Sequence, residues 1–229
     1  MHFYRIGNEF YPSVTTIISS VRPESTQIQD WKDRNGNWRT RLGEAQSVGT
    51  IIHYRILNNL SAHTLELPQL TLEVIPDDAL MRAEIADSMW DGLGLDVGYP
   101  RRVESFVVNH EYRFAGKPDL FAPIDGVLTL VDLKTSKAIY ESHKLQLGGY
   151  HYALGKAAER GMLISLNPDE RTNPSLQAHF IIMSGQELDD YSERFLDLAK
   201  QFYEYGYDKS KFKEEYIVED VNGAHIEKH

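Results

Sequence analysis

The sequence predicts an α/β protein in which helices flank a small mixed β-sheet and a helical region precedes that sheet. Three observations predict this class. Apolar residues recur at helical spacing through the first hundred residues, period-two alternation begins near residue 103, and a helix, a strand and a helix follow. We expect a single domain over 1–229, with a helical part over about 1–100, a sheet core over about 101–205 and a tail over 206–229.

The N-terminal region predicts three helices. Ser13 can cap a short helix that runs to Val21. A second helix is expected over Leu42–Leu60, where small and apolar residues recur every three or four positions. An acidic helix is expected over Asp77–Leu93.

The sheet core begins with a stretch that alternates between apolar and polar residues. We expect one strand over Val103–Phe114, followed by a hairpin and a helix over Ser142–Arg160. A strand over Gln177–Ser184 and a closing helix complete the pattern. Ser184 and Glu187 have capping-box spacing, which marks the start of that last helix.

The hairpin can be placed in register from its turn. Asp125-Gly126 between apolar runs is a strong signal for a two-residue loop, which pairs Ile124 with Val127. Counting back along both strands brings Asp119 opposite Asp132. Because directly opposed like charges destabilise a sheet pair, this register favours a cation between the two carboxylates.

The same register places Lys117 opposite Lys134. Along the second strand, Leu128, Leu130, Asp132 and Lys134 share one face. An apolar strand that ends in Asp-x-Lys beside a second Asp is typical of a hydrolytic metal site. Asp-x-Lys alone is a weak motif, and on an exposed strand it would be an ordinary solvated pair.

Composition narrows the classes of protein. With 41% hydrophobic and 25% charged residues, the chain is typical of a soluble globular protein. It has no apolar run long enough for a membrane span and no secretory signal, so we expect a cytoplasmic protein and no membrane partner. The absence of cysteine excludes disulfides and cysteine-ligated iron–sulfur clusters, so any metal must be held by oxygen and imidazole.

Charge alone does not decide whether nucleic acid is a partner. The net charge is −10, but residues 1–60 carry seven Lys and Arg against five Asp and Glu. The most acidic stretch, 66–96, holds eight acids and one basic residue, and it suits the solvated face of surface helices. Local groups such as Arg34, Arg39 and Arg41 could follow a phosphate backbone.

Four short motifs follow one another along the chain. They are Gly49-Thr50-Ile51-Ile52-His53, Gly116-Lys117-Pro118-Asp119, Asp132-Leu133-Lys134 and Gln146-Leu147-Gly148-Gly149-Tyr150. A helical histidine thus precedes an Asp after Gly-x-x, then Asp-x-Lys on a strand, then Gln-x-x-x-Tyr on a helix. In this order the motifs resemble the PD-(D/E)XK nuclease superfamily in its RecB-like branch.

The N-terminal part refines this resemblance. The run Tyr11-Pro12-Ser13-Val14-Thr15, followed by Trp31, is similar to the subgroup that contains the mitochondrial genome maintenance exonuclease and related phage exonucleases. The resemblance covers about residues 10–160. It implies a restriction-endonuclease-like core.

The resemblance also implies a set of site residues. His53, Asp119, Asp132 and the carbonyl of Leu133 would bind Mg²⁺ or Mn²⁺, and an imidazole among the ligands favours Mn²⁺. Lys134 would stabilise charge on the phosphate, since an ammonium beside two acids stays protonated. Residues expected to contact the nucleic acid are Gln146, Tyr150, Ser136 and Lys137.

From this resemblance we expect the chain to be a metal-dependent deoxyribonuclease. It would be an exonuclease that acts on single-stranded DNA ends in replication, recombination or repair. Its setting would be a bacterial or phage-infected cell, with replication or recombination proteins as partners. One alternative is a duplex-end or structure-specific endonuclease of the same fold. A noncatalytic DNA-binding subunit is a second alternative, against which the retention of Asp119, Asp132 and Lys134 argues.

Overall fold

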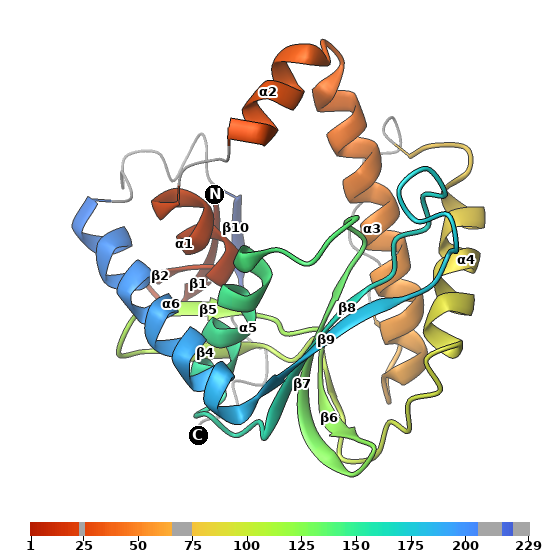
Figure 1. Cartoon of the computed structure of the whole chain (residues 1–229). Coiled ribbons are helices and arrows are strands. Elements are labelled where there is room, and N and C mark those ends of the chain that lie inside the picture. Colours follow the sequence, from red (N-terminus) through yellow and green to blue (C-terminus); the bar gives the residue numbers. More distant parts are fainter. Residues whose placement is uncertain (23–25, 66–74, 206–216, 222–229) are drawn as a thin grey trace.

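A five-stranded mixed sheet forms the centre of the computed structural model, with helices on both of its faces (Figure 1). The structure describes residues 1–22, 26–65, 75–205 and 217–221. The predicted α/β class is therefore confirmed. The strand order is β3-β6-β7-β8-β9, with bounds Arg102–Val103, Leu120–Ile124, Val127–Lys134, Arg160–Ser165 and His179–Ser184.

The predicted hairpin is the antiparallel pair β6 and β7. Ile124 pairs with Val127 and Leu120 with Val131, as the turn signal indicated. Asp125 and Gly126 both have positive φ, which is the conformation of a type I′ turn. The turn therefore fixes the register that the candidate site depends on.

Strand β8 corrects the prediction of one long helix over 142–160. Helix α5, Glu141–Ala153, ends early, and positive φ at Gly155 and Lys156 redirects the chain into β8. Strand β8 pairs in parallel with β7 and antiparallel with β9. Its short apolar run is buried on both sides, so it lacks the alternation that would have marked it as a strand.

Helices α1, α5 and α6 pack on one face of the sheet. Their bounds are Val14–Val21, Glu141–Ala153 and Gly185–Tyr205. The fully buried side chains on this side include Leu130, Leu147 and Phe195. The predicted capping box at the start of α6 is confirmed, because Ser184 and Glu187 exchange hydrogen bonds of 2.8 and 3.2 Å.

Helices α3, Trp38–Leu60, and α4, Ala79–Asp91, cover the other face. Helix α3 begins four residues before the predicted start, and α2, Thr26–Arg34, precedes it as a separate segment (Figure 1). The predicted cap of α1 is confirmed by the Ser13 hydroxyl, which accepts the N–H of Thr16 at 3.0 Å. Part of the acidic stretch, 66–74, lies outside the described residues.

The prediction of a single strand over 103–114 is wrong. The chain instead forms β3, then β4, Val107–Asn109, and β5, Phe114–Gly116. Strands β4 and β5 pair with each other as a separate two-stranded sheet. Positive φ at Glu104 and Arg113 breaks the extended run twice, so residues that alternate in sequence do not share one face.

A third sheet joins the two ends of the chain. Strand β10, Ile217–Asp220, pairs in parallel with β1, His2–Ile6, and β1 pairs with β2, Glu9–Pro12. This pairing is non-local and left no sequence signal. Among the described residues, no helix is long and apolar enough to cross a membrane.

Candidate active site

Two buried carboxylates meet where β6 begins and β7 approaches its end. The pairing of Leu120 with Val131 puts Asp119 next to Asp132, as predicted. Asp119 is 7% exposed and Asp132 is 1% exposed. The carboxylate of Asp119 accepts the backbone N–H of Leu133 at 2.6 Å, which fixes its position against β7.

The predicted pairing of Lys117 with Lys134 does not occur. The β6–β7 ladder ends at Leu120 and β5 ends at Gly116, so Lys117 lies in the link between β5 and β6. The ammonium of Lys117 lies 2.5 Å from Glu219 of β10. Lys117 therefore contributes to a contact with the C-terminal strand.

Helix α3 brings His53 to this pair. Nδ1 of His53 lies 3.4 Å from Oδ1 of Asp119. The glycine one turn earlier, Gly49, allows this approach, because a Cβ there would lie 3.1 Å from the hydroxyl of Thr135. The first motif thus combines a histidine with the small residue that lets its helix lie against the end of β7.

Lys134 connects the carboxylates to helix α5. Its ammonium lies 2.6 Å from Oδ2 of Asp132 and donates a hydrogen bond to Oε1 of Gln146 at 3.0 Å. The amide of Gln146 in turn donates to the hydroxyl of Tyr150 at 3.2 Å. The structure therefore joins Asp132, Lys134, Gln146 and Tyr150 in one continuous chain of polar contacts.

Gly116 explains how Tyr150 reaches this chain. A Cβ at Gly116 would lie 2.5 Å from the ring of Tyr150. The tyrosine is 6% exposed, so its ring fills the space that the missing side chain leaves. The glycine of the second motif and the tyrosine of the fourth are thus a packing pair.

Burial and neighbouring charge set the protonation of these groups. Burial raises the pKa of Asp132 to about 6, with support from the charge of Asp119 and against the effect of Lys134. Burial acts in the same direction on Asp119, but His53 and Lys134 outweigh it and hold the pKa of Asp119 below its usual value. Burial would lower the pKa of His53, yet the Asp119 carboxylate raises it overall.

The donor atoms suit a small divalent cation. Oδ2 of Asp132 is buried, and its described contact is the ion pair with the Lys134 ammonium at 2.6 Å. Carboxylate, carbonyl and imidazole donors match Mg²⁺ and Mn²⁺. In the described part of the chain, however, no three His, Asp or Glu side chains converge as a ready-made metal site. His53 and Asp119 contact each other, so a cation would have to separate them.

Ser136 and Lys137 lie in the loop after β7. The hydroxyl of Ser136 donates to the carbonyl of Ala138 at 2.8 Å, and the Ser136 carbonyl accepts from Ser165 at 2.7 Å. Ser136 thus stabilises the loop, while Lys137 is exposed beside the site. Neither side chain joins the polar chain that ends at Tyr150.

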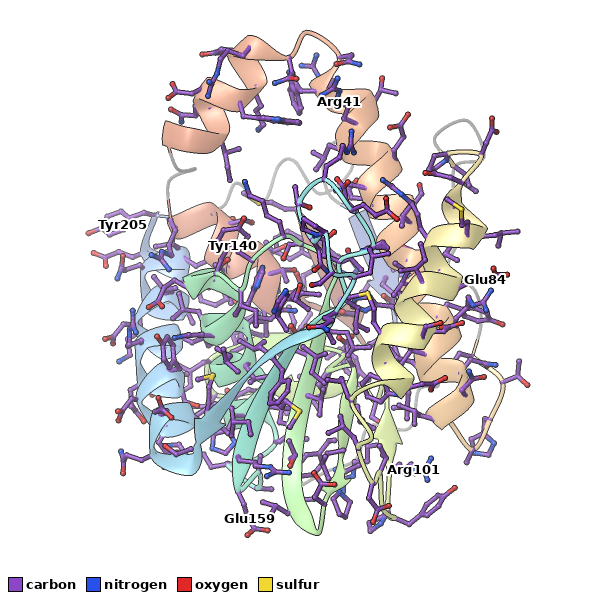
Figure 2. The ribbon with its side chains drawn as sticks, turned by 45° about the vertical axis from the view of Figure 1, so that its right-hand side comes forward. Arg41, Glu84, Arg101, Tyr140, Glu159 and Tyr205 are labelled. Carbon is purple, nitrogen blue, oxygen red and sulfur yellow. The ribbon has the colours of Figure 1, made fainter. Side chains whose placement is uncertain are left out.

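A basic and aromatic patch lies on α2 and the start of α3. Lys32 and Arg39 each lie 4.6 Å from the ring of Trp38, and Trp31 is 37% exposed. Arg41 lies on the same projecting part of the molecule (Figure 2). Basic side chains are therefore concentrated in this patch, although the net charge of the chain is negative.

Glu104 lies close to the two carboxylates, in the break between β3 and β4. Its backbone has a φ of 49°, and its N–H donates to the carbonyl of Asp119 at 3.1 Å. Burial, with the nearby charge of Asp119, raises the pKa of its carboxyl. The break between β3 and β4 positions Glu104, and the alternating pattern of that stretch concealed this break.

Comparisons with known proteins give distant structural similarity. No family model and no curated protein sequence matches the chain. An alkaline exonuclease from Laribacter hongkongensis is similar, with 11% identity over 83% of this chain and 89% of that chain and a TM-score of 0.36. The protein designated SSO0001 is similar, with 16% identity over 66% of this chain and 73% of that chain and a TM-score of 0.31. Because these identities and TM-scores are low, the function of the candidate site is argued from the residues of this chain alone.

Proposed function

We propose that the chain is a metal-dependent deoxyribonuclease that hydrolyses phosphodiester bonds, with single-stranded DNA ends as its substrate. One observation carries the proposal. Asp119 and Asp132 are buried side by side, with Lys134 in contact with Asp132. Two adjacent buried carboxylates cost folding free energy, and such perturbed groups cluster at functional sites.

The residues of the site would have different roles at the scissile phosphate. Bound at these carboxylates, Mg²⁺ or Mn²⁺ would neutralise phosphate oxygens and lower the pKa of an attacking water. Asp132 would bind a cation as the carboxylate, beside its contact with the Lys134 ammonium. Lys134, held between Asp132 and Gln146, would place its positive charge against the phosphate.

Gln146 and Tyr150 would act as positioning residues. Their hydrogen bonds fix the direction of the Lys134 side chain, which otherwise has four rotatable bonds. The restraint comes from α5, so this helix sets the geometry of the reacting end of β7. Lys137, exposed in the following loop, would contact the phosphate backbone.

The decisive experiment compares end-labelled linear single-stranded, linear duplex and circular single-stranded DNA, each with Mg²⁺ or Mn²⁺. We expect degradation of the linear single strand alone, with a loss of at least about a hundredfold in Lys134→Ala. Lys200→Ala is the matched control, because Lys200 is an exposed lysine of α6.

The other outcomes separate the alternatives. Cleavage of circles would make the protein an endonuclease. Cleavage of duplex ends would make it a resection enzyme. No cleavage of any DNA by folded protein with either metal would overturn the proposal.

A further inference from the structure

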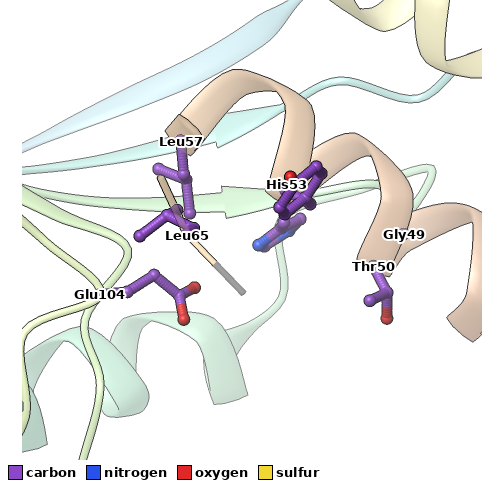
Figure 3. Close-up of a pocket in the computed structure, with 7 residues that line it drawn as sticks. Gly49, Thr50, His53, Leu57, Leu65 and Glu104 are labelled. Carbon is purple, nitrogen blue, oxygen red and sulfur yellow. The ribbon is translucent and has the colours of Figure 1, made fainter. Parts of the chain in front are cut away.

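A cavity of about 290 Å³ opens beside His53, between α3 and the loop that carries Glu104 (Figure 3). It shares His53 with the candidate site, but most of its lining takes no part in the polar chain from Asp132 to Tyr150. Among the described residues, those that line it are Gly49, Thr50, His53, Tyr54, Leu57, Leu65 and Glu104.

The lining has two chemically different parts. Leu57 and Leu65 supply an apolar wall, and Tyr54 adds an aromatic residue. His53 and Glu104 point into the same space from facing sides (Figure 3). The carboxylate of Glu104 accepts no hydrogen bond from any described residue, so it is available to a ligand inside the cavity.

The size of the cavity limits what it can hold. At about 290 Å³, it has room for a single planar ring of the size of a nucleobase. An apolar wall with an aromatic residue suits the face of a planar ring, and a carboxylate suits the N–H groups on the ring's edge. His53, at the boundary, contacts Asp119 of the candidate metal site at 3.4 Å.

We propose that this cavity binds one unpaired nucleobase of the substrate, next to the scissile phosphate. This inference rests on the proposed function, because it takes the occupant to be a base of the strand that the site would cleave. A base in the cavity has left its stack and its pairing partner. Duplex DNA must therefore be opened before it can bind, whereas a single strand presents an unpaired base directly.

The proposal gives Tyr54 and Glu104 separate tasks. Tyr54 stacks on the base and so binds all bases similarly, since every base has a π-face. Glu104 accepts a hydrogen bond from the base edge. The backbone contact of Glu104 with Asp119 ties the position of the base to that of the metal-binding carboxylate.

The test is equilibrium binding without metal, which does not depend on cleavage. A fluorescent single strand of about twenty nucleotides is prepared as a series in which one abasic residue moves along the chain. We expect a loss of affinity of roughly fivefold to tenfold at one position and little change elsewhere. The loss should disappear in Tyr54→Ala, which has no ring to stack on, and persist in Tyr54→Phe.

The controls keep the test decisive. Tyr99→Ala removes an exposed tyrosine that pairs with Arg101 away from the cavity, and it should leave the abasic profile unchanged. Leu65→Trp, which fills the cavity, should reduce the affinity for the intact strand to that for the strand with the sensitive abasic position.

Failure of this inference differs from failure of the proposed function. Equal affinity for every abasic position in the wild-type protein would overturn the base-binding cavity, even if the enzyme degrades DNA. The same holds if Tyr54→Ala keeps the position-dependent loss. Absence of DNA binding and of cleavage together would overturn the nuclease itself.

Discussion

At the scale of single residues, the site is defined by a conflict between burial and charge. Asp119 and Asp132 lie side by side under a nearly complete cover, and their environments drive their pKa values apart. Asp119 has His53 and the N–H of Leu133 as partners, whereas the Lys134 ammonium lies 2.6 Å from Oδ2 of Asp132. The pair is therefore asymmetric in its partners, and Asp132 is the member whose carboxyl burial keeps protonated to a higher pH.

Asp132→Asn should stabilise the metal-free protein at neutral pH. The pKa of Asp132 is raised to about 6 in the folded protein, above the ordinary value of 3.8. As pH rises from about 4 to 6, the unfolded chain loses this proton first, so the free energy of unfolding decreases. By linkage, a shift of about two units corresponds to about 3 kcal/mol, and we expect a gain of about 1–3 kcal/mol at pH 7.5 in the asparagine variant.

Urea unfolding at pH 4.5 and pH 7.5, with a chelator present, measures this effect. The advantage of Asp132→Asn should shrink at pH 4.5, where the wild-type carboxyl is also protonated. Asp197→Asn, on the exposed side of α6, should show no comparable dependence on pH. A wild-type protein that is more stable than the variant at pH 7.5 would mean that the contact between Asp132 and Lys134 outweighs the cost of burial.

At the scale of elements, the two glycines of α5 set how closely the helices pack. A Cβ at Gly148 would lie 2.5 Å from the backbone of Tyr191 in α6, and one at Gly149 would lie 2.9 Å from Val14 of α1. Glycine within a helix costs about 1 kcal/mol relative to alanine, so both positions give up helix stability for close approach. The same helix carries Gln146 and Tyr150, so its placement also sets the position of Lys134.

Gly148→Ala should therefore destabilise the fold although alanine is the better helix former. The clash is with backbone atoms of α6, which no change of side-chain rotamer can relieve. We expect a loss of about 1–3 kcal/mol in the free energy of unfolding, measured by urea titration with circular dichroism. Gly36→Ala is the control, since a Cβ there meets no atom within 4 Å. Equal stability of the two variants would show that α5 and α6 can separate without cost.

The elements that the sequence predicts correctly are those with local signals. The turn at Asp125-Gly126 and the cap at Ser13 depend on neighbouring residues, and both predictions are confirmed. Strand β8 and the break after Glu104 depend on burial and on backbone angles that the surrounding fold imposes. Sequence alone therefore located the carboxylate pair of the site, but it could not locate the cavity beside His53.

At the scale of the whole molecule, the central sheet separates two apolar clusters. The first, with Leu130 and Leu147, lies under α1, α5 and α6, and the second, with Leu120 and Leu57, lies under α3 and α4. Strands β6 and β7 contribute side chains to both clusters. The candidate site lies where these layers meet, because His53 comes from one layer and Gln146 from the other.

This arrangement predicts a single cooperative unfolding transition, which would support the expectation of one domain. Leu130→Ala and Leu120→Ala remove similar side chains from opposite clusters, and each residue is at most 1% exposed. Each substitution should cost about 2–5 kcal/mol and lower the same transition midpoint. Because adjacent strands carry both residues, loss of either cluster leaves the other without a complete sheet to pack on.

Far-ultraviolet circular dichroism follows all helices. The fluorescence of Trp90, isolated by replacing Trp31 and Trp38 with Phe, follows the second cluster, and the two curves should coincide in both variants. If Leu130→Ala shifted the circular dichroism curve and left the fluorescence curve in place, the two layers would be separate folding units, and the site between them would be an interface.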